Sequence, residues 1–137
     1  MFDWKENYSL GIEEIDNQHK HLLEIGTELY DLMASKERRQ SDKYDEIMET
    51  IHKLKDYTVF HFDFEEGLMQ KCNYSDVDNH EKEHRTFVDK ISEIEDEDID
   101  SFQNKITMEL IGFVASWIEK HILETDRKYV AELNACL

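Results

Sequence analysis

The sequence predicts an all-α fold, an antiparallel up-down-up-down four-helix bundle with an irregular N-terminal arm. Its 137 residues include no proline and four glycines, so the residues that most often break helices are nearly absent. Apolar residues recur at alternating steps of three and four along several stretches, which is the spacing of one helix face. Short polar segments join these stretches, and short connections favour antiparallel neighbours in a bundle.

Four predicted helices, taken in chain order, carry these apolar faces. The first face comprises Ile15, His19, Leu22, Leu23, Leu29 and Leu32. The second comprises Tyr44, Ile47, Ile51, Leu54, Thr58, His61, Glu65 and Leu68. The third comprises Val77, His80, His84, Phe87, Ile91 and Ile94, and the fourth comprises Ile106, Leu110, Phe113, Trp117 and His121. Each face therefore has at least one histidine at a position that the spacing assigns to the core.

The segments between the helices are polar and contain residues that favour helix starts. We expect breaks at residues 35–41, 72–75 and 95–100. Ser41, Ser75 and Asp100 are candidate N-caps, because their side-chain oxygens can accept hydrogen bonds from the free N–H groups that begin a helix. The acidic segment 95–100 is interpreted as a solvated loop, since it lacks the glycine and alternating oxygen donors of a calcium loop.

The two ends of the chain are expected to differ from the helices. Residues 1–11 carry Phe2, Trp4 and Tyr8 without helical periodicity, so we expect this arm to lie across the bundle and bury its rings. The tail after Asp126 is expected to be a short helix or a frayed coil. The length is that of one domain, so residues 1–137 are predicted to form a single domain without a linker or transmitter segment.

Charge and hydropathy exclude several classes of partner. The formal net charge of -17 argues against nucleic acids and anionic membrane surfaces, which require clustered lysine and arginine. No apolar run approaches the roughly 20 residues that span a bilayer, and the first residues lack the pattern of a signal peptide. We therefore expect a cytoplasmic monomer, in which Cys72 and Cys136 are reduced thiols because nothing in their spacing indicates a disulfide.

Seven ionisable residues suggest a buried site for two metal ions. They are His19, His61, Glu65, His80, His84, His121 and Asp126. Residues four apart on a helix share one face, as in the pair His61 and Glu65 and the pair His80 and His84. One histidine on an apolar face is more often a hydrogen-bonded core residue, but so many together would be costly to bury without a metal. In contrast, His21 and His52 lie off the faces and are expected at the surface without a role.

Asp126 fits this pattern least well. It follows His121 by five residues, which is about 140° around a regular helix and would turn the two side chains apart. Three alternatives remain at this point. The helix could end near Leu123 so that Asp126 folds back, a π-type turn could bring it round, or Asp126 could be a plain surface residue.

The donor set limits the choice of metal. Imidazole and carboxylate without thiolate suit iron, zinc, copper or nickel, and seven protein ligands are too many for one ion. Two six-coordinate ions that share both carboxylates and a bridging oxide or hydroxide would keep one open position for a small exogenous ligand. Ferritin-like sites use four glutamates and two histidines. The nitrogen-rich set predicted here is expected to favour reversible electron transfer to bound O2.

Four stretches of the chain resemble the signatures of the hemerythrin family, and most closely those of its bacterial single-domain form. They are Ile15-Asp16-Asn17-Gln18-His19, His61-Phe62-Asp63-Phe64-Glu65-Glu66, His80-Glu81-Lys82-Glu83-His84, and Trp117-Ile118-Glu119-Lys120-His121-Ile122 continued to Asp126. The resemblance covers nearly the whole chain, from about Trp4 to Tyr129. It implies a four-helix bundle with a non-haem di-iron centre, oxo- or hydroxo-bridged, that binds O2 reversibly for storage, delivery or scavenging.

The resemblance also implies a role for each site residue. His80, His84 and His121 would hold one iron, and His19 and His61 the other. Glu65 and Asp126 would bridge the two irons, and O2 or a small anion would bind at the iron with two histidines. An apolar O2 pocket would be formed by Leu22, Phe62, Trp117 and Ile118, although these four residues could equally be ordinary core.

Three other functions are compatible with the same residues. The first is an enzyme, such as a peroxidase or a protein that handles nitric oxide, although the inner faces offer no spare acid for proton transfer. The second is a redox or O2 sensor module. The third is a bundle that binds zinc or manganese structurally. We expect an O2-binding protein rather than an enzyme, with at most a minor peroxidase-like activity.

Overall fold

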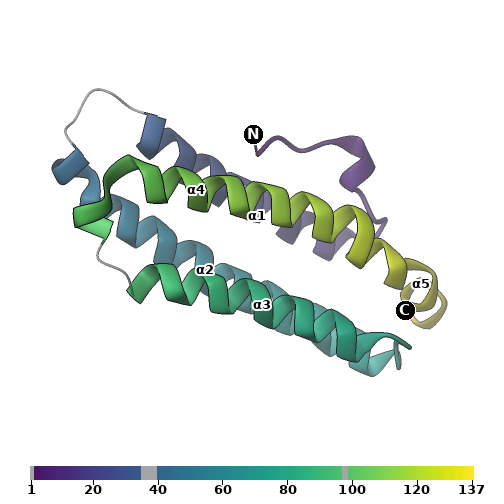
Figure 1. Ribbon diagram of the computed structural model, residues 1–137. Coiled ribbons are helices and arrows are strands. Elements are labelled where there is room, and N and C mark those ends of the chain that lie inside the picture. Colours follow the sequence, from purple (N-terminus) through teal and green to yellow (C-terminus); the bar gives the residue numbers. More distant parts are fainter. Residues whose placement is uncertain (1, 35–39, 97–98) are drawn as a thin grey trace.

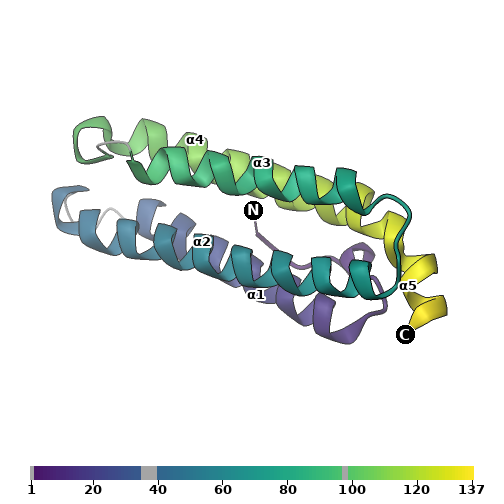
Figure 2. The ribbon, with the colours of Figure 1, turned by 90° about the horizontal axis from the view of Figure 1, so that it is seen from below.

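Four long helices dominate the computed structural model, which describes residues 2–34, 40–96 and 99–137, with backbone alone for residues 40–43, 96 and 99–107 (Figure 1). Helix α1 spans Glu13–Ala34, α2 spans Gln40–Lys71, α3 spans Val77–Asp96 and α4 spans Ile99–Lys120. Successive helices run in opposite directions, with α1 and α2 on one side and α3 and α4 on the other (Figure 2). The predicted all-α, up-down-up-down bundle is confirmed.

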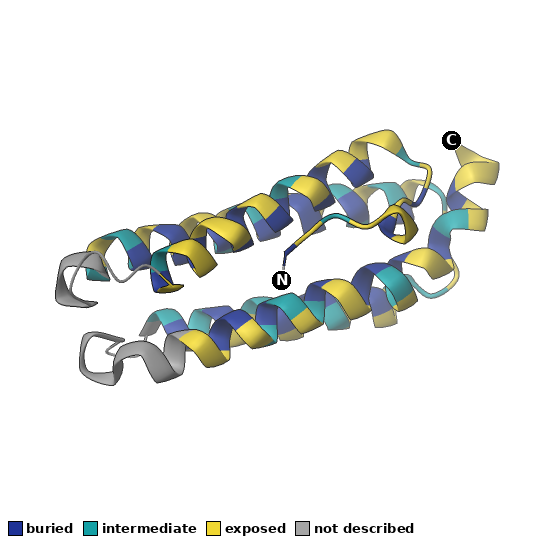
Figure 3. Cartoon of the chain, turned by 90° about the horizontal axis from the view of Figure 1, so that it is seen from above, coloured by how far each residue is buried: buried dark blue, intermediate teal, exposed yellow. Residues whose placement is uncertain are grey.

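The apolar faces predicted from the spacing point into the bundle, where the dark blue buried residues gather (Figure 3). On α2, Ile47, Ile51 and Leu54 are fully buried. The face of α4 is wider than predicted: Phe113 and Trp117 are half-buried, whereas the core also takes Ile111, Val114 and Ile118. Because α4 packs against each of the other three long helices, it needs more than one apolar row. The predicted core position Ile106 lies outside the described side chains.

The N-terminal arm lies along the bundle and not across it (Figure 1), but it buries aromatic rings as predicted. Phe2 and Tyr8 are buried and Trp4 is half-buried, with a 3-10 turn at Glu6–Tyr8. The arm is joined to α1 through Gly11, whose φ of 78° suits glycine. Asp16 holds the turn in place, since its carboxylate accepts hydrogen bonds from the Leu10 N–H and from the Ser9 hydroxyl, each at 2.9 Å.

The predicted cap Ser75 has a different role. Helix α3 begins at Val77, and Ser75 directs its hydroxyl and its backbone N–H to the carboxylate of Glu132 in the C-terminal helix. The contact therefore joins the α2–α3 connection to the end of the chain. The side chains of the other two candidate caps, Ser41 and Asp100, lie outside the described residues.

The chain after α4 is ordered and not frayed. A π-helix at His121–Thr125 leads into a 3-10 helix at Asp126–Tyr129 and then into α5, Val130–Cys136. Cys136 forms a disulfide with Cys72, so the prediction of two reduced thiols was wrong. Their separation of 64 residues gave no signal, yet the fold brings their Cα atoms to 5.6 Å, within the usual range for a disulfide.

In the ranges 2–34, 40–96 and 99–137, no helix combines the length and the apolar character needed to cross a membrane.

Gly26 in α1 provides a test of the packing of the arm. A Cβ atom added at Gly26 would overlap the ring of Phe2, whereas one added at Gly112 in α4 would meet nothing. We expect Gly26→Ala to displace Phe2 and to lower the free energy of unfolding by about 1–3 kcal/mol, the usual cost of overpacking. Urea-induced unfolding, followed by circular dichroism, measures this change.

The matched control is Gly112→Ala, another helical glycine. It should raise the free energy of unfolding by about 0.5–1 kcal/mol, because alanine favours a helix more than glycine does. Equal stabilisation by both substitutions would show that Phe2 does not pack on Gly26.

Candidate metal centre

Side chains from all four long segments of the bundle meet at one buried point. Helix α1 supplies His19, α2 supplies His61 and Glu65, α3 supplies His80 and His84, and the π-helix and its end supply His121 and Asp126. Their potential donor atoms form two groups, one with three histidines and one with two, and Glu65 and Asp126 belong to both groups. Both carboxylates are 0% exposed. The seven residues predicted from the sequence are thus brought together.

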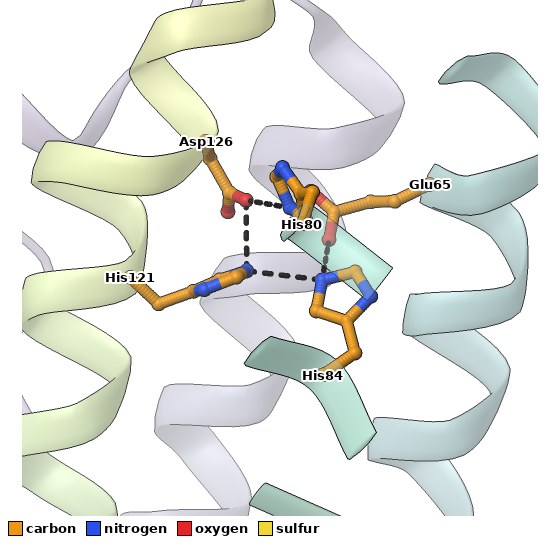
Figure 4. A group of neighbouring side chains, drawn as sticks. All are labelled: Glu65, His80, His84, His121 and Asp126. Carbon is orange, nitrogen blue, oxygen red and sulfur yellow. Dashed lines mark hydrogen bonds and ion pairs between the residues drawn. The ribbon is translucent and has the colours of Figure 1, made fainter. Parts of the chain in front are cut away.

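The group with three histidines is shown in Figure 4. Asp126 Oδ1 lies 3.0 Å from His80 Nε2 and 2.9 Å from His121 Nε2. Glu65 Oε1 lies 3.3 Å from His84 Nε2. Nitrogen and oxygen atoms thus converge from four elements, α2, α3, the π-helix and the 3-10 helix, and their chemistry is that of a metal site.

The group with two histidines uses the same carboxylates. Asp126 turns its second oxygen, Oδ2, to His19 Nε2 at 3.1 Å, and Glu65 Oε1 lies 3.3 Å from His61 Nε2. A carboxylate that faces one group with each oxygen, as Asp126 does, is arranged as a bridge. The geometry suits two adjacent cations better than one.

A π-helix turns Asp126 towards His121. The backbone N–H of Asp126 bonds to the carbonyl oxygen of His121, five residues earlier, so the turn here is wider than that of an α-helix. Of the three alternatives left by the sequence, the π-type turn is the one observed. The surface location is excluded by the complete burial of Asp126.

Several of these buried atoms have no hydrogen-bond partner among the described residues. They are both ring nitrogens of His19 and His80, Glu65 Oε1 and both carboxylate oxygens of Asp126. Although ion-pair distances link some of them, the hydrogen-bond geometry is poor. Leaving so many buried polar atoms unpaired is costly, and a bound cation would compensate for this cost. The residues present therefore fit a metal.

The contact between His84 and His121 supports the same conclusion. The Nδ1 atom of each ring faces a carboxylate, Glu66 at 3.2 Å and Glu83 at 2.9 Å, so each Nδ1 donates. In the neutral rings, both Nε2 atoms then present lone pairs to each other at 3.0 Å. Either a proton or a metal ion must lie between these nitrogens.

Outer hydrogen bonds orient the histidines. Gln18 Oε1 accepts from His61 Nδ1 at 2.6 Å, as Glu66 and Glu83 do from the other two rings. Such bonds fix the tautomer that presents Nε2 to a metal. Tyr129 adds a bond of 2.6 Å from its hydroxyl to Glu65 Oε2. These four partners were not predicted.

The sequence offered little signal for these partners. Glu66 and Glu83 are each adjacent in sequence to a member of the site, so they fall off the apolar faces. Gln18 is likewise adjacent to a site residue, His19, and its burial is evident only from the structure.

Electrostatics in the metal-free protein show how strongly the site favours positive charge. Burial and repulsion from Asp126 would raise the pKa of Glu65. The charge of His61 and hydrogen bonds from His61 and His84 outweigh these effects and hold the pKa of Glu65 below its usual range. Burial lowers the pKa of His61. Burial would also lower the pKa of His121, but Asp126 and then Glu83 raise it to about 10.

A small cavity adjoins the centre. Its lining includes Leu22, Phe62, Trp117 and Ile118, the four residues suggested as a pocket. The remaining lining residues are His19, Thr58, His61, Phe87, His121 and Ile122. The space open to the centre of a water-sized molecule is about 10 Å³, about the lower limit for holding one such molecule.

The two histidines predicted to lie outside the site have side chains at the surface. The side chain of His21 is 44% exposed and that of His52 is 55% exposed. His21 contacts Glu24 and the ring of Tyr57, and His52 pairs with Glu95.

The four-helix bundle and the two histidine groups that share buried carboxylates are the features of a helical-bundle metal-binding protein. The family model described as the hemerythrin HHE cation binding domain matches residues 10–133, and the chain belongs to the hemerythrin family. It is 42% identical over 130 residues to the bacteriohemerythrin of Clostridium acetobutylicum, covering 95% of this chain and 99% of the relative.

More distant relatives agree with this assignment. The bacteriohemerythrin of Pseudomonas aeruginosa is 36% identical over 129 residues, which cover 93% of this chain and 78% of the relative. The myohemerythrin of Theromyzon tessulatum is 28% identical over 132 residues, which cover 96% and 93%.

Removal of one imidazole tests the metal centre. We expect His80→Ala to lower the affinity for zinc by more than about 100-fold, the upper end of the effect of losing an outer partner. Zinc retained after desalting, together with thermal unfolding in the presence of zinc, measures the loss. His21→Ala should change neither quantity, and a similar loss in both variants would contradict the assignment.

The raised pKa of His121 predicts that a metal competes with a proton. At about pH 8 the metal-free ring is protonated, so binding at Nε2 must release that proton, and the affinity should rise about tenfold per pH unit up to about pH 10. In the metal-free protein, the stabilisation from this proton is complete below pH 6.5 and is lost as the pH rises through about 10.

Zinc titration in weakly buffered solution, with the released protons counted by a pH-stat, measures the effect. Glu83→Gln is the informative variant, because it removes one carboxylate that holds the proton and should end the pH dependence at a lower pH. Zinc binding at pH 8 without proton release would contradict the prediction.

Proposed function

We propose that the chain holds two iron ions and binds O2 reversibly, for oxygen storage, delivery or scavenging. The observation that carries the proposal is the sharing of two buried carboxylates between a group of three histidines and a group of two. Membership of the hemerythrin family supports iron as the metal, with an oxo or hydroxo bridge as the resemblance implies. When bound, two ferrous ions would supply the electrons that are transferred reversibly to O2.

The residues would divide between the two irons as the two groups do. His80, His84 and His121 would hold one iron and His19 and His61 the other, with Glu65 and Asp126 between them. The iron with fewer protein nitrogens would keep a free position. The cavity would lie beside that position, since both histidines of the smaller group line it and His121 is the one member of the larger group that does so.

The lining of the cavity suits a neutral diatomic ligand. Leu22, Phe62, Trp117 and Ile118 provide apolar surface that excludes water from the open position. The hydroxyl of Thr58 donates to the Leu54 carbonyl oxygen at 2.6 Å and is therefore not directed at a ligand. This lining supports binding of O2 rather than proton-dependent turnover of a polar substrate.

The proposed carrier acts in the cytoplasm as a monomer, and small anions would compete with O2 at the open position. The disulfide Cys72–Cys136 is uncommon for a cytoplasmic protein, because cytosolic disulfides are mostly transient and take part in redox chemistry.

Cycles of oxygenation test the proposal. The protein is loaded with ferrous iron without air, exposed to O2, purged with argon, and followed by its visible absorption. We expect colour to appear with O2 and to fade on purging through several cycles. Colour that fades only after a reductant is added would indicate an oxidised centre and would favour a redox sensor or a peroxidase.

Two threonine variants distinguish an O2 carrier from an enzyme. Thr58 lines the cavity, whereas Thr50 lies about two turns earlier in the same helix. The hydroxyl of each threonine donates a hydrogen bond to the carbonyl oxygen four residues before it. We expect Thr58→Val and Thr50→Val to support oxygenation cycles equally. Loss of O2 binding or of peroxide turnover in Thr58→Val alone would show that a proton from this hydroxyl is required.

A further inference from the structure

The disulfide Cys72–Cys136 joins two segments at one end of the bundle (Figure 1). It joins the residue after α2 to the last turn of α5, the helix that follows Asp126 and Tyr129 in sequence. In Figure 1, α5 lies at the end of the bundle where α2 and α3 are connected. The crosslink therefore ties the segment that carries Asp126 to the rest of the bundle.

The two cysteines differ in exposure. Cys136 is exposed, whereas Cys72 is half-buried against an apolar cluster. We call this cluster the end cluster: Leu10, Ile15, Met69, Tyr74, Tyr129 and Leu133. A reagent in solution thus meets Cys136 before Cys72.

The end cluster connects the disulfide to the centre. Tyr129 bonds to Glu65, and its ring stacks on His80 with centroids 5.5 Å apart. Tyr74, two residues after Cys72, packs edge-on against both rings. Each half of the disulfide is therefore close in sequence to a tyrosine that contacts His80.

Few other contacts hold α5. It has seven residues, too few for an isolated helix to be stable in water. Its other attachments in the described structure include the pair Ser75–Glu132, the buried side chain of Leu133 and the partly buried side chain of Val130, which packs on the end cluster. Opening of the disulfide would leave this short helix to these non-covalent contacts.

We propose that Cys72–Cys136 is a second redox site, where exchange with a dithiol loosens the segment that holds Asp126 and Tyr129 at the metal centre. The exchange itself is independent of the proposed function, but its effect on metal retention rests on the proposed metal centre.

The reaction is a thiol–disulfide exchange. A thiolate of the dithiol attacks Sγ of Cys136, the S–S bond breaks, and Cys72 leaves as a thiolate that takes up a proton. The second thiol of the reagent then displaces Cys136 from the mixed disulfide. The protein gains two electrons and two protons as two thiols, and the dithiol becomes a cyclic disulfide.

The experiment compares zinc release from oxidised and reduced protein. Native protein is reduced with dithiothreitol, its thiols are counted and alkylated, and the reagents are removed before zinc is loaded, because dithiols bind zinc. Zinc release to a chromophoric chelator is then measured, with circular dichroism as the check that the bundle remains folded.

We expect two thiols per chain after reduction and zinc release about tenfold faster, at the lower end of the effect of losing an outer partner of a metal site. Cys136→Ser should release zinc at this faster rate whether or not it has been reduced. The matched control is Ala135→Ser, an exposed neighbour on α5, which should behave as the native protein does.

Two results would overturn the inference: a disulfide that resists dithiothreitol in the folded protein, or equal zinc release before and after reduction. Failure of the oxidised protein to take up zinc would overturn the proposed metal centre and the coupling with it. Thiol counting separates these cases, since it reports the exchange without a metal.

Discussion

Two carboxylates with no solvent exposure, Glu65 and Asp126, dominate the energetics of this bundle. Two negative charges in an apolar core are very unfavourable unless positive charge lies beside them, and five imidazoles from four segments are directed at them. The need for compensation explains the raised pKa of His121, the facing nitrogens of His84 and His121, and the number of unpaired buried atoms. The helices are thus joined at one point by electrostatics as well as along their length by apolar packing.

The outer hydrogen bonds extend this arrangement to the surface. Glu83 in α3 accepts hydrogen bonds from His121 Nδ1 and from the Thr125 hydroxyl. It therefore contacts the first and the last residue of the π-helix. These bonds lower the pKa of Glu83 to about 2, against the opposing effect of burial. Because Glu83 is partly exposed, it connects a buried ring to solvent, and the charge state of the centre is not isolated from its surroundings.

Helical spacing was sufficient to predict the four helices, their inward faces and the buried positions of the five histidines and Glu65, because the same periodicity governs apolar packing and the ionisable residues that replace core residues. It could not decide the location of Asp126, since five residues reach the same face only if the helix is locally wider. Ser75 was assigned as a cap from its residue type, but a distant carboxylate competes for its hydroxyl. The disulfide and the bond from Tyr129 to Glu65 join residues 64 apart in sequence, and local patterns carry no information about such contacts.

The π-helix has an effect on the path of the chain beyond the residue that it turns inward. One extra residue in a turn rotates all that follows by about 100° relative to the axis of α4. Tyr129 is thereby directed into the bundle, where it bonds to Glu65. The same rotation changes the direction in which α5 begins, so that Glu132 reaches Ser75 in the α2–α3 connection. In a chain without proline, a single surplus residue thus steers the backbone where a loop or a kink would otherwise be required.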